Sequence, residues 1–508
     1  MIQVVWFKRD LRTIDHAALS AAALHGPVLP LYIVEPQLWQ QADVSHRQYQ
    51  FLTECLAELD SALQSFGQGL VVRVGDAVDV LNQLHQDYQI AAIWSHQETW
   101  NGWTFQRDKR ILAWTQQHTI PWHEPTQNGV IRRLADRDGW AIQWYKTMDK
   151  AIVPAPNKLT QISIPSDKLP SADTLGLSPD GCVAAQRGGR RRALHLLDSF
   201  LSSRGEHYTK AMSSPVTAFD SCSRLSAHLA YGTLSIREVF QALAQHQQYV
   251  RQLPTGRKGQ WPSGLQSFSG RLRWHCHFIQ KLEDEPRSEF ENLHPAYDGL
   301  RENDFNQAYF EAWQTGHTGY PMVDACMRAL IATGWLNFRM RAMVMSFASY
   351  HLWLHWRKPA LHLARLFTDY EPGIHYSQVQ MQSGTTGINS IRIYNPIKQG
   401  IDHDSEGHFI RQWLPELANM PIETLHTPWL APDKMNGYPM PIVDEASARK
   451  SAAAKLYQLR KNDSHEATAK KIVKKHGSRK KSTLNTSRRR KKGGDTEMKQ
   501  PKQTELAL

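Results

Sequence analysis

The stretch that most constrains the fold is 313–357, which consists of two long apolar segments broken at Gly334. Apolar side chains recur in it at spacings of three and four residues, as at Val323, Met327 and Leu330, and this period predicts packed helices. The few polar side chains that interrupt the two segments include several arginines. A buried arginine needs a carboxylate, a phosphate or a nucleic acid as its partner, so we expect these helices to face one of the three.

Upstream of this stretch, short apolar runs alternate with helical patterns. The runs begin near residue 2 and recur at 28–34, 70–75 and 90–96. Strands that alternate with helices predict a parallel sheet covered on both faces, so we expect a doubly wound α/β domain over residues 1–130. Neither GxGxxG nor GxxxxGK(S/T) occurs, so ordinary dinucleotide or nucleoside triphosphate binding has no motif in its favour.

Composition divides the rest of the chain. Residues 131–192 are rich in Pro, Gly and Ser and lack a sustained period, which predicts an inter-domain connector. Helical periodicity dominates 193–445, where we expect an all-helical domain. Residues 446–508 are basic without apolar periodicity, which predicts a disordered tail that either adds non-specific affinity for nucleic acid or keeps the protein soluble. From Lys461 onward, 15 Lys and Arg stand against 5 Asp and Glu, so ten of the chain's net twelve positive charges lie there.

The cysteines and histidines exclude several kinds of site. Five scattered cysteines without a CxxC pair argue for a reducing compartment and against a disulfide framework, structural zinc or a four-cysteine iron–sulfur cluster. His275 and His277 are two residues apart, which places them on different faces of a helix, so we expect no metal site. No stretch resembles a signal peptide or reaches membrane-spanning length, and we expect a cytoplasmic monomer.

Four segments resemble one superfamily. The sequence TGYPMVDACMRALIATGWLNFRMR at 318–341 resembles the pattern TGxPxVDAxMRxLxxTGWxHNRxR of photolyases and cryptochromes. WFKRDLR at 6–12, SRLSAHLAYGTLSIR at 223–237 and FIRQWLPEL at 409–417 resemble other parts of the same superfamily. The resemblance implies that the helical domain holds FAD non-covalently. It also implies that the α/β domain can hold an antenna chromophore of the folate or deazaflavin type.

The resemblance further implies which side chains hold the flavin. Arg341 is expected to pair with Asp369, and His375 stands where the superfamily has Asn or Asp facing flavin N5, a position that tunes the redox and protonation state of the cofactor. The implied set is Tyr208, Ser221, Cys222, Ser223, Arg224, Leu225, Ser226, Phe268, Arg271, His275, Arg341, Asp369, Glu371 and His375.

Within this set, 221–226 has a physical reading of its own. Three serine hydroxyls and Arg224 at the start of a helix suit a pyrophosphate, because a helix N-terminus favours anions. The alternative is an ordinary N-cap at Asp220 or Ser221 before an amphipathic helix.

The expected DNA-facing residues depart from the superfamily pattern. Trp274 stands where photolyases have the tryptophan that stacks beside a flipped-out lesion. Arg271 replaces a glutamate that hydrogen-bonds the damaged pyrimidine, so a donor cation stands in place of an acceptor. The resemblance gives Trp274, Arg271 and His375 as catalytic residues, and Trp274, Asn337 and Arg339 as contacts to damaged DNA, single- or double-stranded.

A second departure concerns electron transfer. Trp356 and Trp313 match the middle and outer members of the three-tryptophan chain that photoreduces the flavin in this superfamily. Val379 replaces the member nearest the flavin. Either another residue donates the electron, or this chain does not photoreduce its flavin by this route. The candidates for another donor are Tyr376, Trp353 and Trp335.

Two functions therefore stay open. The first is a blue-light-driven DNA repair enzyme in which excited reduced flavin passes an electron to a pyrimidine dimer, and Trp274 and the basic tail favour it. The second is a cryptochrome-like blue-light photoreceptor without repair activity. Arg271, His275, Phe338 and Val379 favour either the photoreceptor or a divergent repair specificity.

Overall fold

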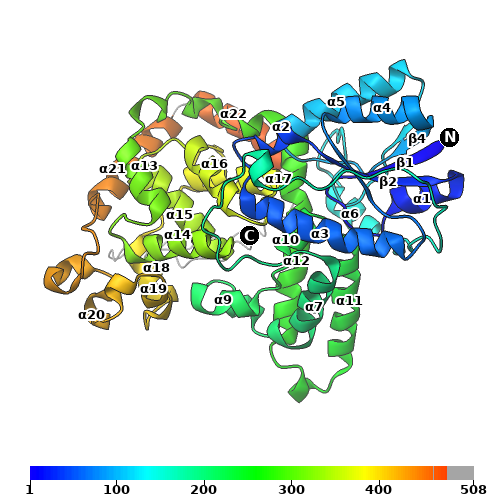
Figure 1. The fold of residues 1–508 in the computed structure, drawn as a ribbon. Coiled ribbons are helices and arrows are strands. Elements are labelled where there is room, and N and C mark those ends of the chain that lie inside the picture. Colours follow the sequence, from blue (N-terminus) through cyan, green and yellow to red (C-terminus); the bar gives the residue numbers. More distant parts are fainter. Residues whose placement is uncertain (462, 478–508) are drawn as a thin grey trace, which may run out of the picture.

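The computed structural model describes residues 1–461 and 463–477, and the remainder of the predicted basic tail lies outside the described residues. An α/β domain and a larger helical domain lie side by side (Figure 1). Within the described ranges, no helix is long and apolar enough to cross a membrane.

The α/β domain is built on a five-stranded parallel sheet with the order β3-β2-β1-β4-β5. The strands are β1 (Ile2–Phe7), β2 (Val28–Val34), β3 (Val71–Val74), β4 (Ile90–Trp94) and β5 (Trp122–His123). Alternate residues of β1 face opposite sides of the sheet, because successive side chains of a strand alternate. Val5 packs on the side of α1 (Ala17–His25) and α3 (His46–Gln64), and Val4 packs on the side of α4 (Ala77–Tyr88) and α5 (Gly102–Gln117). The predicted doubly wound domain is confirmed.

The strand order reverses between β1 and β4, and a buried polar cluster lies at this end of the sheet. Asp10 Oδ2 accepts a hydrogen bond of 2.7 Å from His96 Nδ1 and lies 3.0 Å from His16 Nε2. Asp10 Oδ1 accepts from the Lys8 main-chain N–H at 2.8 Å. Ligands of doubly wound domains bind at such reversal points, but here both histidines contact Asp10, which fixes the loop after β1.

The connector is more structured than predicted. It contains α6 (Trp140–Met148), because Trp140, Trp144 and Met148 recur every four residues and bury their side chains in the core of the helical domain.

The α/β domain also contains one short helix, α2 (Pro36–Trp39), which precedes α3.

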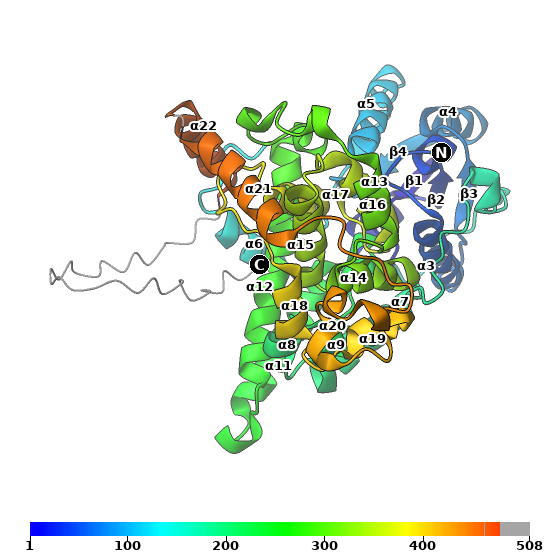
Figure 2. The ribbon, with the colours of Figure 1, turned by 90° about the vertical axis from the view of Figure 1, so that its left-hand side faces the viewer.

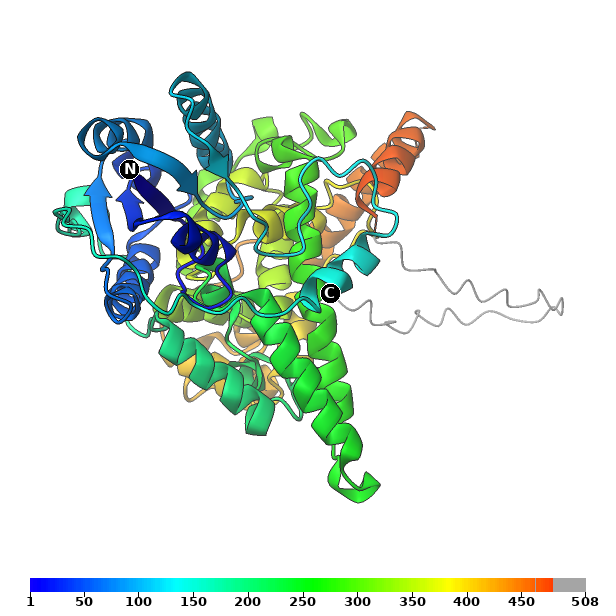
Figure 3. The same ribbon diagram turned by 90° about the vertical axis from the view of Figure 1, so that its right-hand side faces the viewer.

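The helical domain begins at α7 and is confirmed as all-helical. Its longest helices, α11 and α12, form a hairpin that projects from the body (Figure 3). The helices are α7 (Arg190–Ser199), α8 (Tyr208–Ala211), α9 (Pro215–Ser221), α10 (Ser226–Ala230), α11 (Ile236–Gln252), α12 (Trp261–Asp284), α13 (Gln307–Thr315), α14 (Pro321–Thr333), α15 (Phe338–Ser346), α16 (Arg357–Leu366), α17 (Pro372–Ser383), α18 (Pro396–His403), α19 (His408–Trp413), α20 (Ile422–Leu425), α21 (Glu445–Arg460) and α22 (Asp463–His476).

The prediction of disorder from residue 446 was wrong for the described part of the tail. Helices α21 and α22 pack on the helical domain, on the side away from the sheet (Figure 2). Asp444 caps α21 by accepting a hydrogen bond from the Ser447 N–H, and the His465 ring stacks on His294 with 4.1 Å between ring centroids. These two helices therefore extend the folded domain.

The start of α3 joins the two domains. All five N–H groups of the buried Arg47 guanidinium donate hydrogen bonds, two to Asp180 and three to main-chain oxygens at the C-terminal ends of α14 and α16. Gln48 and Ser45 donate to further oxygens at the end of α16. The last carbonyls of a helix have no partner within it and carry partial negative charge, so a cation is favoured there.

Candidate functional site

A cavity of about 330 Å³ lies in the helical domain between α8, α12, α15 and α17. Most of the side chains expected at the flavin line it, although they come from distant parts of the sequence. The predicted residues in its wall are Tyr208, Cys222, Ser223, Arg224, Leu225, Ser226, Phe268, Arg271, Trp274, His275, Asn337, Arg341, Asp369, Glu371 and His375. Outside its lining lie Ser221, Arg339, Trp313 and Trp356.

Arg224 gives one end of the cavity a buried positive charge. Its guanidinium lies between the rings of Phe219 and Trp335, at 4.0 and 4.2 Å from their centroids, and the residue is 8% exposed. Burial lowers the pKa of Arg224 to about 10. Its Nε and Nη1 find no hydrogen-bond partner among the described residues. A buried cation with open donors is costly unless an anion meets it, so this end of the cavity suits a phosphate.

The segment around Arg224 differs from the prediction. The helix α9 ends at Ser221 and α10 begins at Ser226, so Asp220 and Ser221 end one helix and do not cap the next. The residues between form a turn in which Arg224 has a φ of 60°. For a residue with a side chain this left-handed conformation is uncommon, and here it turns the guanidinium into the cavity wall.

Arg341 and Asp369 form the predicted ion pair. The two Nη atoms of Arg341 donate to the two carboxylate oxygens of Asp369 at 3.0 and 2.8 Å, and Nε donates to the Leu336 carbonyl at 2.7 Å. The Arg341 guanidinium also lies 4.0 Å from the Phe367 ring centroid. This bidentate arrangement fixes both side chains in the wall of the cavity.

His375 is held as a neutral acceptor. Its Nε2 lies 2.9 Å from the Ala360 carbonyl oxygen and must carry a hydrogen to bond it, so Nδ1 keeps a free lone pair. Burial lowers the pKa of His375 to about 4, which keeps the ring neutral at physiological pH. His275, which also lines the cavity, has its pKa lowered to about 4 by burial as well.

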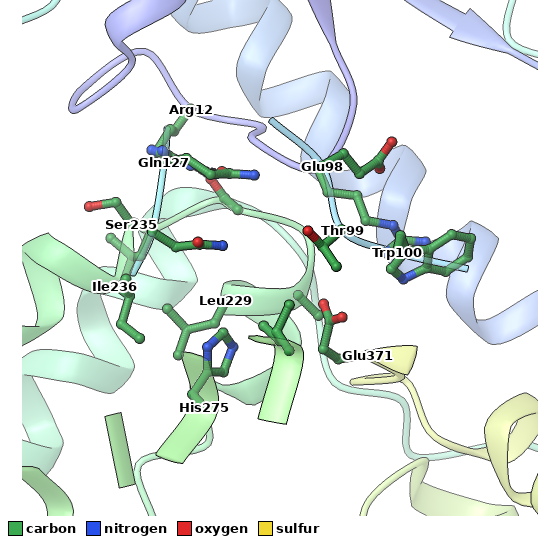
Figure 4. A pocket seen from close by; sticks show the side chains of 16 residues that line it. Arg12, Glu98, Thr99, Trp100, Gln127, Leu229, Ser235, Ile236, His275 and Glu371 are labelled. Atoms are coloured by element: carbon green, nitrogen blue, oxygen red, sulfur yellow. Dashed lines mark hydrogen bonds between the residues drawn. The ribbon is translucent and has the colours of Figure 1, made fainter. Parts of the chain in front are cut away.

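A second cavity of about 40 Å³ adjoins the first at the domain interface (Figure 4). Leu229, His275 and Glu371 line both cavities, and Arg12 and Gln127 of the other domain complete the small one. Figure 4 shows Glu371 and His275 entering from the helical side and Arg12 and Gln127 from the opposite side. Glu371 therefore stands between the large cavity and a small one with several polar side chains in its lining.

Glu371 yields a testable pH dependence. Burial raises its pKa from 4.5 to about 8, with Arg9 opposing the shift, and its Oε1 has no hydrogen-bond partner among the described residues. Folding therefore takes up a proton between these two pKa values, so this group's contribution to stability is complete below pH 4.5 and is lost as pH rises through 8.

Between pH 4.5 and pH 8, the free energy of unfolding should fall less steeply with pH in the E371Q variant than in wild type. The difference in slope should reach about 1.4 kcal/mol per pH unit. Denaturant unfolding of the apoprotein at several pH values measures it. Equal slopes in the two proteins would show that Glu371 ionises normally.

The wall expected to face a lesion is aromatic. The half-buried Trp274 ring stacks on Phe278, with 5.5 Å between centroids and 26° between planes. The Arg271 guanidinium lies 4.7 Å from the Phe338 ring centroid, and its Nη2 lies 3.4 Å from Met212 Sδ. Phe338 thus holds Arg271 against the wall by a cation–π contact.

Asn337, predicted to contact DNA, lines the large cavity and is tied to a neighbouring segment. It is 3% exposed, and its Nδ2 donates to the Met212 and Ser213 carbonyls at 3.0 Å each. It therefore ties that segment to the start of α15. Arg339 is half-buried, lies 3.5 Å from Ser213 Oγ and is outside the cavity lining.

Comparisons with known proteins agree with this site. A family model described as DNA photolyase matches residues 3–149, and one described as the FAD binding domain of DNA photolyase matches 268–458. The chain belongs to the photolyase and cryptochrome family.

Relatives in this family extend over nearly the whole chain. A deoxyribodipyrimidine photo-lyase of Streptomyces griseus is 29% identical over 88% of this chain and 97% of its own length. Cryptochrome-2 of Arabidopsis thaliana is 28% identical over 90% of this chain and 79% of its own length. The structure of a class III photolyase from Agrobacterium tumefaciens superposes with a TM-score of 0.79, at 27% identity, over 91% of this chain and 98% of that one.

The cofactor that this family domain binds is FAD, and the cavity fits it. Arg224 offers open donors to a phosphate, and the Arg341–Asp369 pair and Glu371 offer polar groups to a ring edge. The remaining lining residues are mostly apolar and suit a flat ring, as at Phe268 and Leu272.

The three positions that the resemblance assigns to electron transfer are divided between the cavity wall and the core. Val379 lines the cavity, and neither Trp356 nor Trp313 does. Trp313 is 0% exposed, so the predicted outer member has no contact with solvent. Trp353 lies between two cations, Arg301 at 4.4 Å and Lys455 at 4.3 Å from its ring centroid.

Sequence reasoning missed Tyr370, although it named the residues on both sides of it. Tyr370 lines the cavity, and its hydroxyl donates to Asp43 Oδ2 of the α/β domain at 2.7 Å. No local pattern connects two residues so far apart in the chain, so only the fold reveals the contact.

Proposed function

We propose that the chain is a light-driven DNA repair enzyme that, with FAD in the large cavity, splits pyrimidine dimers. The relatives named deoxyribodipyrimidine photo-lyase support this proposal. The observation that carries it is Trp274, which lies half-buried in the cavity wall on Phe278 and so offers a flat surface to an extruded base. Extrusion costs least at a damaged site, where pairing and stacking are already weakened.

The residues of the chain would bind, orient and exclude water. Arg224 would meet a cofactor phosphate, and the Arg341–Asp369 pair would fix the position of the ring. When bound and reduced, FAD supplies on excitation the electron that splits the dimer. Because this chemistry needs no nucleophile from the protein, the main tasks are positioning and redox tuning, which the neutral His375 would serve.

Arg271 would set the lesion preference. An arginine donates only, so it would recognise a phosphate or a pyrimidine carbonyl oxygen where a glutamate would recognise an N–H. Its contacts with Phe338 and Met212 hold it in place without neutralising it. The substrate would be damaged DNA in the cytoplasm, single- or double-stranded, bound by one copy of the chain. A folate or deazaflavin antenna would be an addition to this function, not a condition for it.

The alternative is a blue-light photoreceptor without repair activity. Relatives named cryptochrome favour it, and so does the packing of Arg271 on Phe338 at the expected lesion contact.

The deciding experiment uses purified protein with chemically reduced flavin and an oligonucleotide that carries one cyclobutane thymine dimer. Single- and double-stranded forms are compared in blue light and in darkness. We expect light-dependent loss of the dimer, with a strand preference that an R271E variant alters. Absence of dimer loss in both forms, with the flavin confirmed as reduced, would overturn dimer repair and leave another lesion or the photoreceptor role.

Removing the Trp274 ring should weaken dimer binding. We expect the W274A variant to bind the dimer-containing strand roughly tenfold or more weakly, because stacking of one base contributes about 1–3 kcal/mol. Binding is measured by fluorescence anisotropy, and the flavin spectrum checks that the cavity is intact. W103A on α5 is the matched control and should bind normally. Equal binding by W274A and wild type would remove Trp274 from the substrate site.

A further inference from the structure

Val379 leaves the flavin cavity without the tryptophan that would donate an electron, and Tyr370 lies in the same cavity wall. Tyr370 is 3% exposed, and its ring lies 5.3 Å from that of His375, nearly perpendicular to it. Both residues line the large cavity. An aromatic side chain capable of oxidation is therefore present next to the place of the flavin.

The Tyr370 hydroxyl is built to lose a proton. Its hydrogen bond to Asp43 Oδ2 is 2.7 Å long, and Asp43 is buried at the domain interface, where Asn101 Nδ2 donates to the same oxygen at 3.2 Å. Burial raises the pKa of Tyr370 well above its usual range, so the phenol is protonated. Oxidation of a protonated phenol releases the proton, and a carboxylate within hydrogen-bond distance can accept it.

A path of aromatic rings leads from Tyr370 toward the surface. The hydroxyl oxygens of Tyr370 and Tyr376 are 3.3 Å apart. Ring centroids are 6.3 Å apart between Tyr376 and Trp356, and 5.5 Å apart between Trp356 and His355. The His355 side chain is 22% exposed. Trp356 therefore keeps a place in an electron path that differs from the predicted one.

The other candidate donors are less suitable. Tyr376 lies outside the lining of the large cavity, and each of the two tryptophans has a cation on its ring. Trp335 carries the Arg224 guanidinium at 4.2 Å from its ring centroid, and Trp353 has Arg301 at 4.4 Å. A cation on the face of a ring opposes the removal of an electron from that ring. Tyr370 is bonded to a carboxylate, which favours its oxidation.

We propose that Tyr370 donates the electron that photoreduces the flavin in this protein, with Asp43 taking up the phenolic proton. The proposal rests on the proposed function in one respect, that FAD occupies the large cavity. An electron leaves the Tyr370 ring for the excited oxidised flavin as the O–H bond breaks and the proton moves to Asp43. Trp356 returns an electron through Tyr376, and Asp43 returns the proton to Tyr370. Because Trp356 is buried, a thiol in solution restores its electron at the His355 end of the path. Two thiols form one disulfide and release two protons to solvent for every two electrons delivered.

The test follows the visible absorption of oxidised flavin in the FAD-loaded protein under blue light, without oxygen and with a thiol. We expect Y370F to lose this absorption about tenfold more slowly than wild type, and W356F to be slowed as well. W313F, which alters the outer tryptophan of the family chain, should stay within about twofold of wild type. In heavy water the wild type should slow measurably, and the slow residual reaction of Y370F should not.

Two results with the ring variants would overturn the proposal. One is photoreduction of Y370F at the wild-type rate, and the other is a tenfold slower W313F. D43N gives an independent measurement, because it keeps the Tyr370 ring and removes the proton acceptor. Photoreduction of D43N at the wild-type rate, with an unchanged isotope effect, would also count against the proposal. The flavin spectrum before illumination separates a failure to bind FAD from a failure of the donor. Dimer repair by the chemically reduced wild-type protein, which needs no photoreduction, separates a failure of the proposed repair function from a failure of the donor.

Discussion

Replacing Arg224 with methionine is expected to weaken FAD binding by roughly a hundredfold or more. Two donors of Arg224 stand open in the cavity wall, and hydrogen bonds to charged groups contribute about 1.5–3 kcal/mol each. Methionine keeps an apolar stem between Phe219 and Trp335 but offers no donor. Titration of the apoprotein with FAD, followed by flavin fluorescence, measures the change.

The R339M variant is the matched control. Arg339 is a half-buried arginine of the same domain that lies outside the cavity lining, so its loss should leave FAD binding within about threefold of wild type. The R224M apoprotein should be at least as stable as wild type, because the substitution removes a buried cation whose cost is visible in its lowered pKa. Unchanged FAD affinity in R224M would show that the phosphates are held elsewhere.

Replacing Arg47 with methionine should cost about 3–5 kcal/mol in the free energy of unfolding. The substitution removes all five hydrogen bonds that the guanidinium donates, including the ion pair with the Asp180 carboxylate and the bonds to the Leu330, Ile331 and Leu366 carbonyls. Urea unfolding monitored by tryptophan fluorescence measures the loss.

The comparison for Arg47 is R187M. Arg187 pairs with Glu54, which lies on α3 like Arg47. The Arg187 side chain is 66% exposed, and an exposed ion pair contributes about 0–1 kcal/mol. A similar small loss in both variants would mean that water replaces Arg47 at the domain interface.

The sequence predicts the two domains because their signals are local. Alternating apolar runs specify the sheet, and periods of three and four specify the helices of the flavin domain. The cavity residues follow from resemblance, since Arg224, Arg341 and Asp369 occupy recognisable positions in long similar segments. The structure adds that Arg341 and Asp369 pair and that Arg224 keeps open donors.

The errors share one physical origin, which is that the stabilising partners are distant in sequence. In α21, only Ala452 and Leu456 are buried apolar residues, so the segment has too little apolar periodicity to be recognised as folded. It is held by contacts such as Lys455 over the Trp353 ring, which no local pattern contains. The hydrogen bonds of Asn337 were not predicted for the same reason, because its partners are main-chain oxygens of another segment.

The domain interface at α3 has an evolutionary consequence. Arg47, Gln48 and Ser45 donate mainly to main-chain oxygens at the ends of α14 and α16, and every residue type supplies such an oxygen. Substitutions at those acceptor positions therefore leave the bonds intact as long as the helices end where they do. The helical domain can thus change its sequence there, and with it the shape of the neighbouring flavin cavity, without compensating changes in the α/β domain.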